Sequence, residues 1–206
     1  MKHLSLFGLA IVALSPMAGA QDDSAEEIDE VVVTADYRQA SINDISASIT
    51  VLDSALMQRK GAKHLEDLLL DAANVNFSSG ASRARFYQIR GIGERGQFSE
   101  PLNPSVGVII DGVDFSGIGN AATLYDGEQV EILMGPQGTR YGSNALAGLI
   151  NLKTKAPTDE FVYGLQADIA NYDSKGIAGY VSGPLSDIVL YRLSVQTLTS
   201  DGFSDN

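Results

Sequence analysis

The chain has 206 residues, with 14 lysine and arginine residues against 26 aspartate and glutamate residues, and its formal net charge is −12. Such an acidic chain argues against nucleic-acid binding, which needs clustered basic side chains to neutralise phosphates. It contains no cysteine, which excludes disulfide bonds and a lipid-modified N-terminal cysteine.

Residues 1–20 predict a secretory signal peptide. Lys2 and His3 precede an apolar run at 4–14, and the small residues at 18–20 form a cleavage signal. The alternative is a short membrane anchor, but the apolar run is well below the ~20 residues that a spanning helix needs. We therefore expect export from the cytoplasm and cleavage near Ala20.

Residues 21–45 predict a disordered acidic segment that contains one short apolar run. Residues 21–30 carry six carboxylates and no cation, a composition that cannot bury enough apolar surface to fold. A β-prone run follows at 31–34, between this tail and another polar stretch. Two interpretations stay open: a core strand of a folded domain, or a linear motif that pairs with the sheet edge of a partner.

Residues 46–157 predict one compact α+β domain. A helix should follow the first strand, with Asp53 or Ser54 as its N-cap and Gly61 at its end. A second helix is expected at about 64–72, with its leucines on one side. The expected strands are 48–53, 86–89, 106–111, 129–134 and 148–153.

The stretch IRGIGERG, residues 89–96, has the G-x-G-x-x-G spacing of dinucleotide-binding loops. Asp111 even stands where such folds place a ribose-binding acid. However, that fold needs a helix of about ten residues after the third glycine, and two prolines interrupt the short segment 97–105. We therefore predict that Gly91 and Gly93 form a turn at the end of a strand, and that 94–104 is a loop.

Long strands with strict alternation follow residue 157. Apolar residues at 161, 163, 165, 167 and 169 share one face, and a second alternating strand covers 189–196, with a weaker strand at about 175–183 between them. This pattern is typical of a transmembrane β-barrel, although a soluble antiparallel sandwich has the same alternation. A barrel needs at least about eight strands, so we expect the chain to be a truncated part of a longer protein.

Several motifs together resemble TonB-dependent outer-membrane receptors. DEVVVTA at 29–35 resembles a TonB box, QIRGIG at 88–93 and VGVIIDGV at 106–113 resemble plug strands, and residues 129–155 are similar to the signature that ends the plug. The resemblance implies an α+β plug domain at 46–157. It also implies that 158–206 holds the first three or so antiparallel strands of a transmembrane barrel, which has about 22 strands in the full-length family.

The resemblance also implies a location and two partners. The protein would lie in the outer membrane of a Gram-negative bacterium, in contact with its lipid, and would import a scarce nutrient with energy relayed by TonB. The acidic tail would hold the TonB box away from the plug, so that it can pair as a strand with TonB. The residues of this predicted contact are Asp29, Glu30, Val31, Val32, Val33, Thr34 and Ala35.

The expected ligand is a ferric siderophore, because arginines in the plug loops supply positive charge within an acidic chain. The alternative for these arginines is pairing with carboxylates that line the barrel. Other nutrients that the family resemblance leaves open are haem, cobalamin and glycans. The residues predicted to bind the ligand are Arg83, Arg85, Arg95, Gly96, Gln97, Phe98 and Asn120.

One position departs from the family pattern. The family commonly has Arg where this chain has Met134, and that Arg would pair with a carboxylate such as Glu131 to link plug and barrel. Methionine cannot make this ion pair. Either Arg140 compensates or the plug is held less tightly, so Glu131 and Arg140 are the predicted plug–barrel contacts.

Enzymatic function has little support in the sequence. There is no Cys/His cluster for zinc and no serine nucleophile motif, and the carboxylates are scattered rather than paired. The segment GPQGTRYG at 135–142 lacks the lysine of a phosphate-binding loop. We therefore predict no catalytic residue, metal or cofactor. A secreted, soluble, β-rich binding protein of the adhesin kind is the remaining alternative to a receptor.

Overall fold

The computed structural model describes residues 32–33, 40–41, 47–80, 82–98 and 100–201. The described residues all belong to one compact unit, which begins at Val31. The predicted signal peptide and most of the predicted acidic segment lie outside the described residues. No helix in the described parts is long and apolar enough to cross a membrane.

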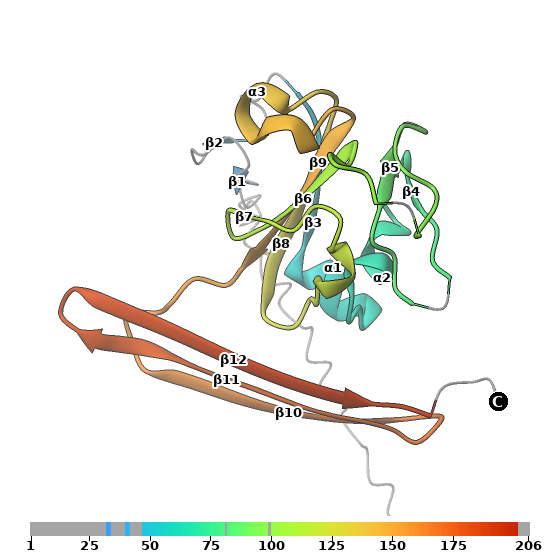
Figure 1. Ribbon diagram of the computed structural model, residues 1–206. Coiled ribbons are helices and arrows are strands. Elements are labelled where there is room, and N and C mark those ends of the chain that lie inside the picture. The colour runs from blue at the N-terminus through green and yellow to red at the C-terminus, as the bar shows by residue number, and fades with distance from the viewer. Residues whose placement is uncertain (1–31, 34–39, 42–46, 81, 99, 202–206) are drawn as a thin grey trace, which may run out of the picture. The chain divides into compact units, whose positions relative to one another are not determined.

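A five-stranded mixed sheet forms the centre of the α+β domain (Figure 1). Its strand order is β3 (Ser48–Asp53), β8 (Gly127–Met134), β9 (Gly148–Thr154), β6 (Val106–Ile110) and β7 (Val113–Asp114). The β6–β9 pair is parallel and the other pairs are antiparallel. The strands predicted in this domain are confirmed, with small differences at their ends.

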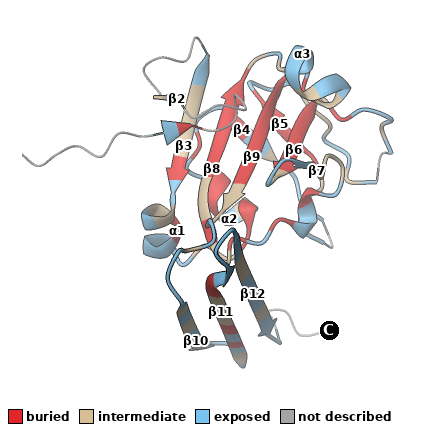
Figure 2. Cartoon of the chain, turned by 90° about the vertical axis from the view of Figure 1, so that its left-hand side faces the viewer, coloured by how far each residue is buried: buried red, intermediate tan, exposed pale blue. Residues whose placement is uncertain are grey.

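Most residues of the central strands of this sheet are buried, as Figure 2 shows in red, and their side chains belong to two clusters. Alternate residues of a strand point to opposite faces. Ile132 and Ile150 therefore join the main core, whereas Leu133 and Leu149 join a second, smaller cluster on the other face. This double burial explains why strands such as VGVII are continuously apolar.

Two short helices contribute to the main core. Helix α1 (Ser54–Lys60) has Asp53 as its N-cap, whose carboxylate accepts a hydrogen bond from the Leu56 amide at 2.7 Å, and Gly61 ends it with φ +60°. Helix α2 (Leu65–Leu69) is shorter than predicted, because the Asp71 and Ala72 amides bond to carbonyls three residues earlier, as turns rather than α-helix. The leucines predicted to share one side are buried, namely Leu65, Leu68 and Leu69.

A small hairpin carries the glycine-rich stretch. Strand β4 (Val75–Phe77), which the sequence did not predict, pairs with β5 (Tyr87–Ile89). Arg90 and Gly91 then adopt φ +53° and +80°, while Ile89 and Ile92 exchange backbone hydrogen bonds across them. Two consecutive residues with positive φ make a tight hairpin turn. The prediction of a turn at the end of a strand is confirmed.

The β-prone run at 31–34, for which a core strand was one of two open interpretations, forms strand β1 (Val32–Val33) where it is described. Several other short elements were not predicted. They are β2 (Ala40–Ser41), β7, the 3-10 helices η2 (Gly119–Ala121) and η3 (Gly142–Asn144), and helix α3 (Gly138–Tyr141). Each is too short to produce a periodic sequence pattern.

Strands β10 (Val162–Ala170), β11 (Ser174–Ser186) and β12 (Val189–Thr199) form a separate antiparallel sheet. Its register places Gln166, Ala178 and Gln196 side by side on one face. The other face carries the apolar set, where the exposed fractions of Leu165 and Ile169 are 83% and 88%. The predicted alternation is thus confirmed, with an apolar face and a polar face.

Candidate functional site

The apolar run predicted to bind TonB is attached to the plug where it is described. Val33 is fully buried against Ile109, Leu133 and Leu149, and the Gln129 amide donates a hydrogen bond to the Val32 carbonyl at 3.1 Å. The expectation that the box is held away from the plug is therefore wrong for these two residues. The reason is that a small apolar cluster on the second face of the sheet accepts the valine side chain. The box residues at 29–31, 34 and 35 lie outside the described residues.

A buried polar group lies beneath this attachment. Glu131 is fully buried, and its carboxylate accepts hydrogen bonds from Gln129 at 2.6 Å and from Asn151 at 3.0 Å. The Gln129 amide nitrogen therefore bridges Glu131 and the backbone of β1. These hydrogen bonds satisfy a carboxylate that would otherwise be costly to bury. Both of these hydrogen-bond partners of Glu131 belong to strands of the plug sheet.

The other two residues of the predicted plug–barrel link lie apart from these hydrogen bonds. Met134 is buried in the main core, and its sulfur accepts a hydrogen bond from the Ser48 hydroxyl at 3.9 Å. Arg140 is exposed on α3 and lines a cavity of about 240 Å³ with Asp114 and Asn144. Contact of Glu131 and Arg140 with a barrel stays a prediction.

Arg85 holds three plug loops together. Its guanidinium donates to the Gly117 carbonyl at 3.1 Å, to the Gln97 carbonyl at 3.3 Å and to Glu100 at 3.1 Å, and it lies over the Phe86 ring at 5.2 Å. The Gln97 side-chain oxygen accepts a hydrogen bond from the Arg85 amide at 2.6 Å. Arg85 and Gln97, two of the predicted ligand residues, thus form hydrogen bonds within the plug. Arg85 pairs with a carboxylate, as the alternative proposed, but this carboxylate is Glu100 of a neighbouring plug loop.

The remaining predicted ligand residues are exposed at the surface of the same loops. Arg83, Arg95, Gly96 and Asn120 are all exposed, and the exposed fraction of Phe98 is 91%. The Ser78 hydroxyl donates to the Arg95 carbonyl at 2.7 Å, which fixes that loop against β4. Their side chains can therefore reach a ligand without disturbing the core.

His64 connects α2 to the loop that contains Asn120. Its Nδ1 accepts a hydrogen bond from the Glu66 amide at 3.3 Å, and its Nε2 lies 3.1 Å from the Asn120 carbonyl, so that the neutral ring with a proton on Nε2 satisfies both. Burial lowers the pKa of His64, and the positive charge of Arg83 lowers it further. The folded protein therefore favours the neutral imidazole.

A pH dependence of stability follows from His64. The unfolded chain binds more protons than the folded one just below the unfolded pKa of about 6.5, so stability is complete above that pH and falls as the pH decreases through the lowered folded pKa. Urea unfolding at pH 7.5 and 5.5 should show the loss. The variant His64→Asn, which retains a good N-cap, should lose less stability over the same interval. Equal losses in both proteins would contradict this role.

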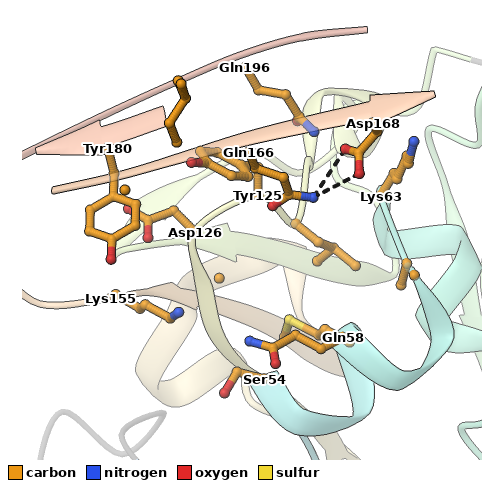
Figure 3. A pocket seen from close by; sticks show the side chains of 17 residues that line it. Ser54, Gln58, Lys63, Tyr125, Asp126, Lys155, Gln166, Asp168, Tyr180 and Gln196 are labelled. Carbon is orange, nitrogen blue, oxygen red and sulfur yellow. Dashed lines mark hydrogen bonds between the residues drawn. The ribbon is translucent and has the colours of Figure 1, made fainter. Parts of the chain in front are cut away.

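One contact joins the plug to the β10–β12 sheet and was not predicted. Asp126, just before β8, forms an ion pair with Arg192 of β12, and only 5% and 10% of their side-chain surfaces are exposed. A cavity of about 570 Å³ lies beside it, lined by plug residues such as Lys63 and by strand residues such as Gln166 (Figure 3). The sequence showed Arg192 only as a polar residue in an alternating strand.

Comparisons with known proteins agree with this architecture. Residues 41–149, more than half of the chain, match the family described as TonB-dependent Receptor Plug Domain. The pesticin receptor of Yersinia pestis is 31% identical over 198 residues, which cover 93% of this chain and 28% of that protein. A vitamin B12 transporter of Vibrio vulnificus is 27% identical over 209 residues, covering 98% of this chain and 33% of the transporter.

A solved structure supports the same assignment. The ferric yersiniabactin uptake receptor of Yersinia pestis is 28% identical, with a TM-score of 0.61 over 75% of this chain and 24% of that receptor. The chain thus spans about a third or less of the length of these relatives. Members of the family are transporters rather than enzymes. The fold, the order of its motifs and the family match give one conclusion: this chain belongs to the TonB-dependent receptor plug domain family.

Proposed function

We propose that the protein is a TonB-dependent importer of the bacterial outer membrane, and that it takes up a ferric siderophore. The observation that carries the proposal is the plug fold, followed directly by strands with one apolar and one polar face. The siderophore is supported by the likeness to the ferric yersiniabactin uptake receptor. Vitamin B12 is the second candidate, because a transporter of that vitamin matches 98% of the chain.

The β10–β12 sheet has the surface expected of the first strands of a barrel in lipid. Leu165, Ile169 and Leu193 are largely exposed on one face, and Gln166, Asp168 and Gln196 lie on the other. Exposing so wide an apolar face to water is unfavourable, whereas contact with lipid hydrocarbon is favourable. This favours a membrane receptor over the soluble β-rich alternative. The signal peptide predicted at 1–20, with cleavage near Ala20, agrees with export.

TonB would bind strand β1 in place of the plug, so that β1 changes its partner. In the plug-bound state, Val33 is buried and the Val32 carbonyl is hydrogen-bonded, so pairing with TonB requires β1 to leave. Burial of one valine contributes roughly 1.5–3 kcal/mol, and each backbone hydrogen bond to TonB about 0.5–1.5 kcal/mol net. The two states are therefore close in free energy, which suits a contact that must form and dissociate in each transport cycle.

The ligand would bind to the exposed plug loops whose conformation Arg85 stabilises. Arg83 and Arg95 supply positive charge, which attracts an anionic ferric siderophore, and Phe98 offers an aromatic surface. Arg85 and Gln97 would contribute by shaping these loops, and Gly96 and Asn120 lie at the same surface.

Uptake of radiolabelled compounds by cells that carry the complete gene tests the proposal. Ferric yersiniabactin and vitamin B12 are the two probes, and uptake of neither would refute the assignment. The double variant Arg83→Ala/Arg95→Ala should weaken binding of the transported siderophore by roughly tenfold or more, because two exposed charges are lost. Arg59→Ala is the matched control, since Arg59 is exposed on α1. Equal binding by both variants would contradict the site.

A further inference from the structure

We infer that Arg192 and Asp126 anchor the plug to the inner face of the β10–β12 sheet and thereby set how readily the plug leaves the wall. This rests on the proposed function, in which that sheet is barrel wall. The contact is bidentate: Arg192 Nε donates to Asp126 Oδ2 at 2.6 Å, and Nη2 donates to Oδ1. The guanidinium also lies over the Tyr180 ring, with Cζ 4.4 Å from the ring centroid. Arg192 is thus held by two groups, the Asp126 carboxylate and the Tyr180 ring.

Both partners are placed rigidly by their own elements. Asp126 has φ +64°, a conformation that aspartate tolerates better than most residues, and its carbonyl accepts a hydrogen bond from the Lys155 amide at 3.0 Å. Arg192 is paired with Ser182 across the strands, and Tyr180 lies two residues further along β11 on the same face. The ion pair therefore forms without reorganisation of either backbone.

The region next to the ion pair is hollow and polar. The cavity of about 570 Å³ separates the plug from the strands there, and Figure 3 shows both sets of side chains around it. Its polar lining includes Gln58, Lys63 and Lys155 of the plug, and Gln166, Asp168 and Gln196 of the strands. A cavity of this size with several polar side chains has room for water. The plug is therefore held here by an ionic contact with defined geometry.

The ion pair and the adjoining cavity together hold the plug in a defined position and still allow it to separate from the sheet. A buried ion pair loses most stability when one partner is removed, because the other charge stays buried and unpaired. When plug and wall separate as a whole, the adjoining cavity opens, and both charges instead regain hydration. Asp126 also precedes β8, the strand that pairs with both β3 and β9 and that carries Gln129 against Val32. The anchor thus holds the main plug sheet close to the point where TonB would pull.

The anchor is tested in cells that carry the complete gene by substituting its two charges. Asp126→Asn and Arg192→Gln should each increase susceptibility to vancomycin by roughly tenfold, because a loosened plug opens the barrel to a solute too large for intact pores. Arg192→Lys should be intermediate, since lysine lacks the bidentate fork. The double variant should be less permeable than two independent effects predict, because neither charge is then left unpaired. Glu128→Gln is the control, as it removes the Lys153 ion pair within the plug.

Two results would overturn the inference: single variants that behave as Glu128→Gln does, or a double variant whose effects simply add. Receptor amount in isolated outer membranes is measured for each variant. If Arg192→Gln is not assembled, Arg192→Lys and Asp126→Asn decide the matter. Uptake of ferric yersiniabactin and vitamin B12 is recorded in parallel. If wild-type cells import neither probe, the proposed function is refuted. The vancomycin susceptibility of the variants would still test whether Asp126 and Arg192 anchor the plug.

Discussion

Replacing Val32 by proline is expected to abolish nutrient uptake by the complete receptor while leaving ligand binding at the cell surface unchanged. Proline has no backbone N–H, so a strand that contains it cannot complete its hydrogen bonds with a partner strand. The exposed plug loops predicted to bind ligand do not contact Val32, whose partners are Ser41 and Gln129. Radiolabelled ferric yersiniabactin binding at low temperature and its uptake at growth temperature separate the two effects.

The matched control is Val32→Ile, which keeps both the backbone N–H and the preference for strands. This variant should transport as the wild type does, because Val32 is partly exposed and a larger side chain can be accommodated. Normal uptake by the proline variant would refute strand pairing with TonB at this position. Loss of binding together with uptake would instead indicate a folding defect.

Replacing Gly93 by alanine is expected to destabilise the plug by more than about 4 kcal/mol, an exceptional value for one methyl group. Gly93 has φ +144°, which L-residues rarely adopt, and a β-carbon there would overlap the Tyr87 carbonyl oxygen and crowd the Gln88 backbone. Backbone atoms of a paired strand cannot move aside cheaply. Urea unfolding of the purified protein measures the loss.

Gly91 in the same turn provides the control. It also has positive φ, +80°, but a β-carbon at this position would meet no atom within 4 Å. Gly91→Ala should therefore cost only about 1–2 kcal/mol, the penalty for a left-handed residue. If the two variants were equally stable, steric overlap would not be the reason for glycine at position 93.

The difference between Gly91 and Gly93 separates what the sequence of the glycine-rich stretch could predict, a turn, from what it could not, the glycine that is essential. The two prolines after Gly96 were enough to favour a turn over a dinucleotide-binding loop, because their effect on the backbone is local. They could not indicate which glycine is indispensable. That depends on the carbonyl of Tyr87, which folding of the hairpin brings against Gly93.

Ion pairs were the least predictable part of the candidate site. Arg85 was predicted to face a ligand, yet its guanidinium contacts Glu100 and the carbonyls of two loops. Glu131 and Arg140 were the predicted plug–barrel contacts and stay predictions, whereas the described ion pair between the plug and the β10–β12 sheet joins Asp126 to Arg192, 66 positions later. A charged side chain carries no local signal for its partner, because long side chains can pair with any opposite charge that the fold brings near.

Local structure and family membership could be predicted from the sequence. Helix caps at Asp53 and Gly61, a turn at the end of the strand before Gly91, and the alternation of β10 and β12 follow from hydrogen bonds and side-chain directions within a few residues. The turn was predicted at Gly91 and Gly93, whereas the structure places it at Arg90 and Gly91. The burial of Val33 in the plug and the contact of Gln129 with Val32, 97 positions earlier, could not be predicted and are seen in the folded chain. Such contacts depend on which surfaces meet after the strands have paired, and that information is distributed over the whole chain.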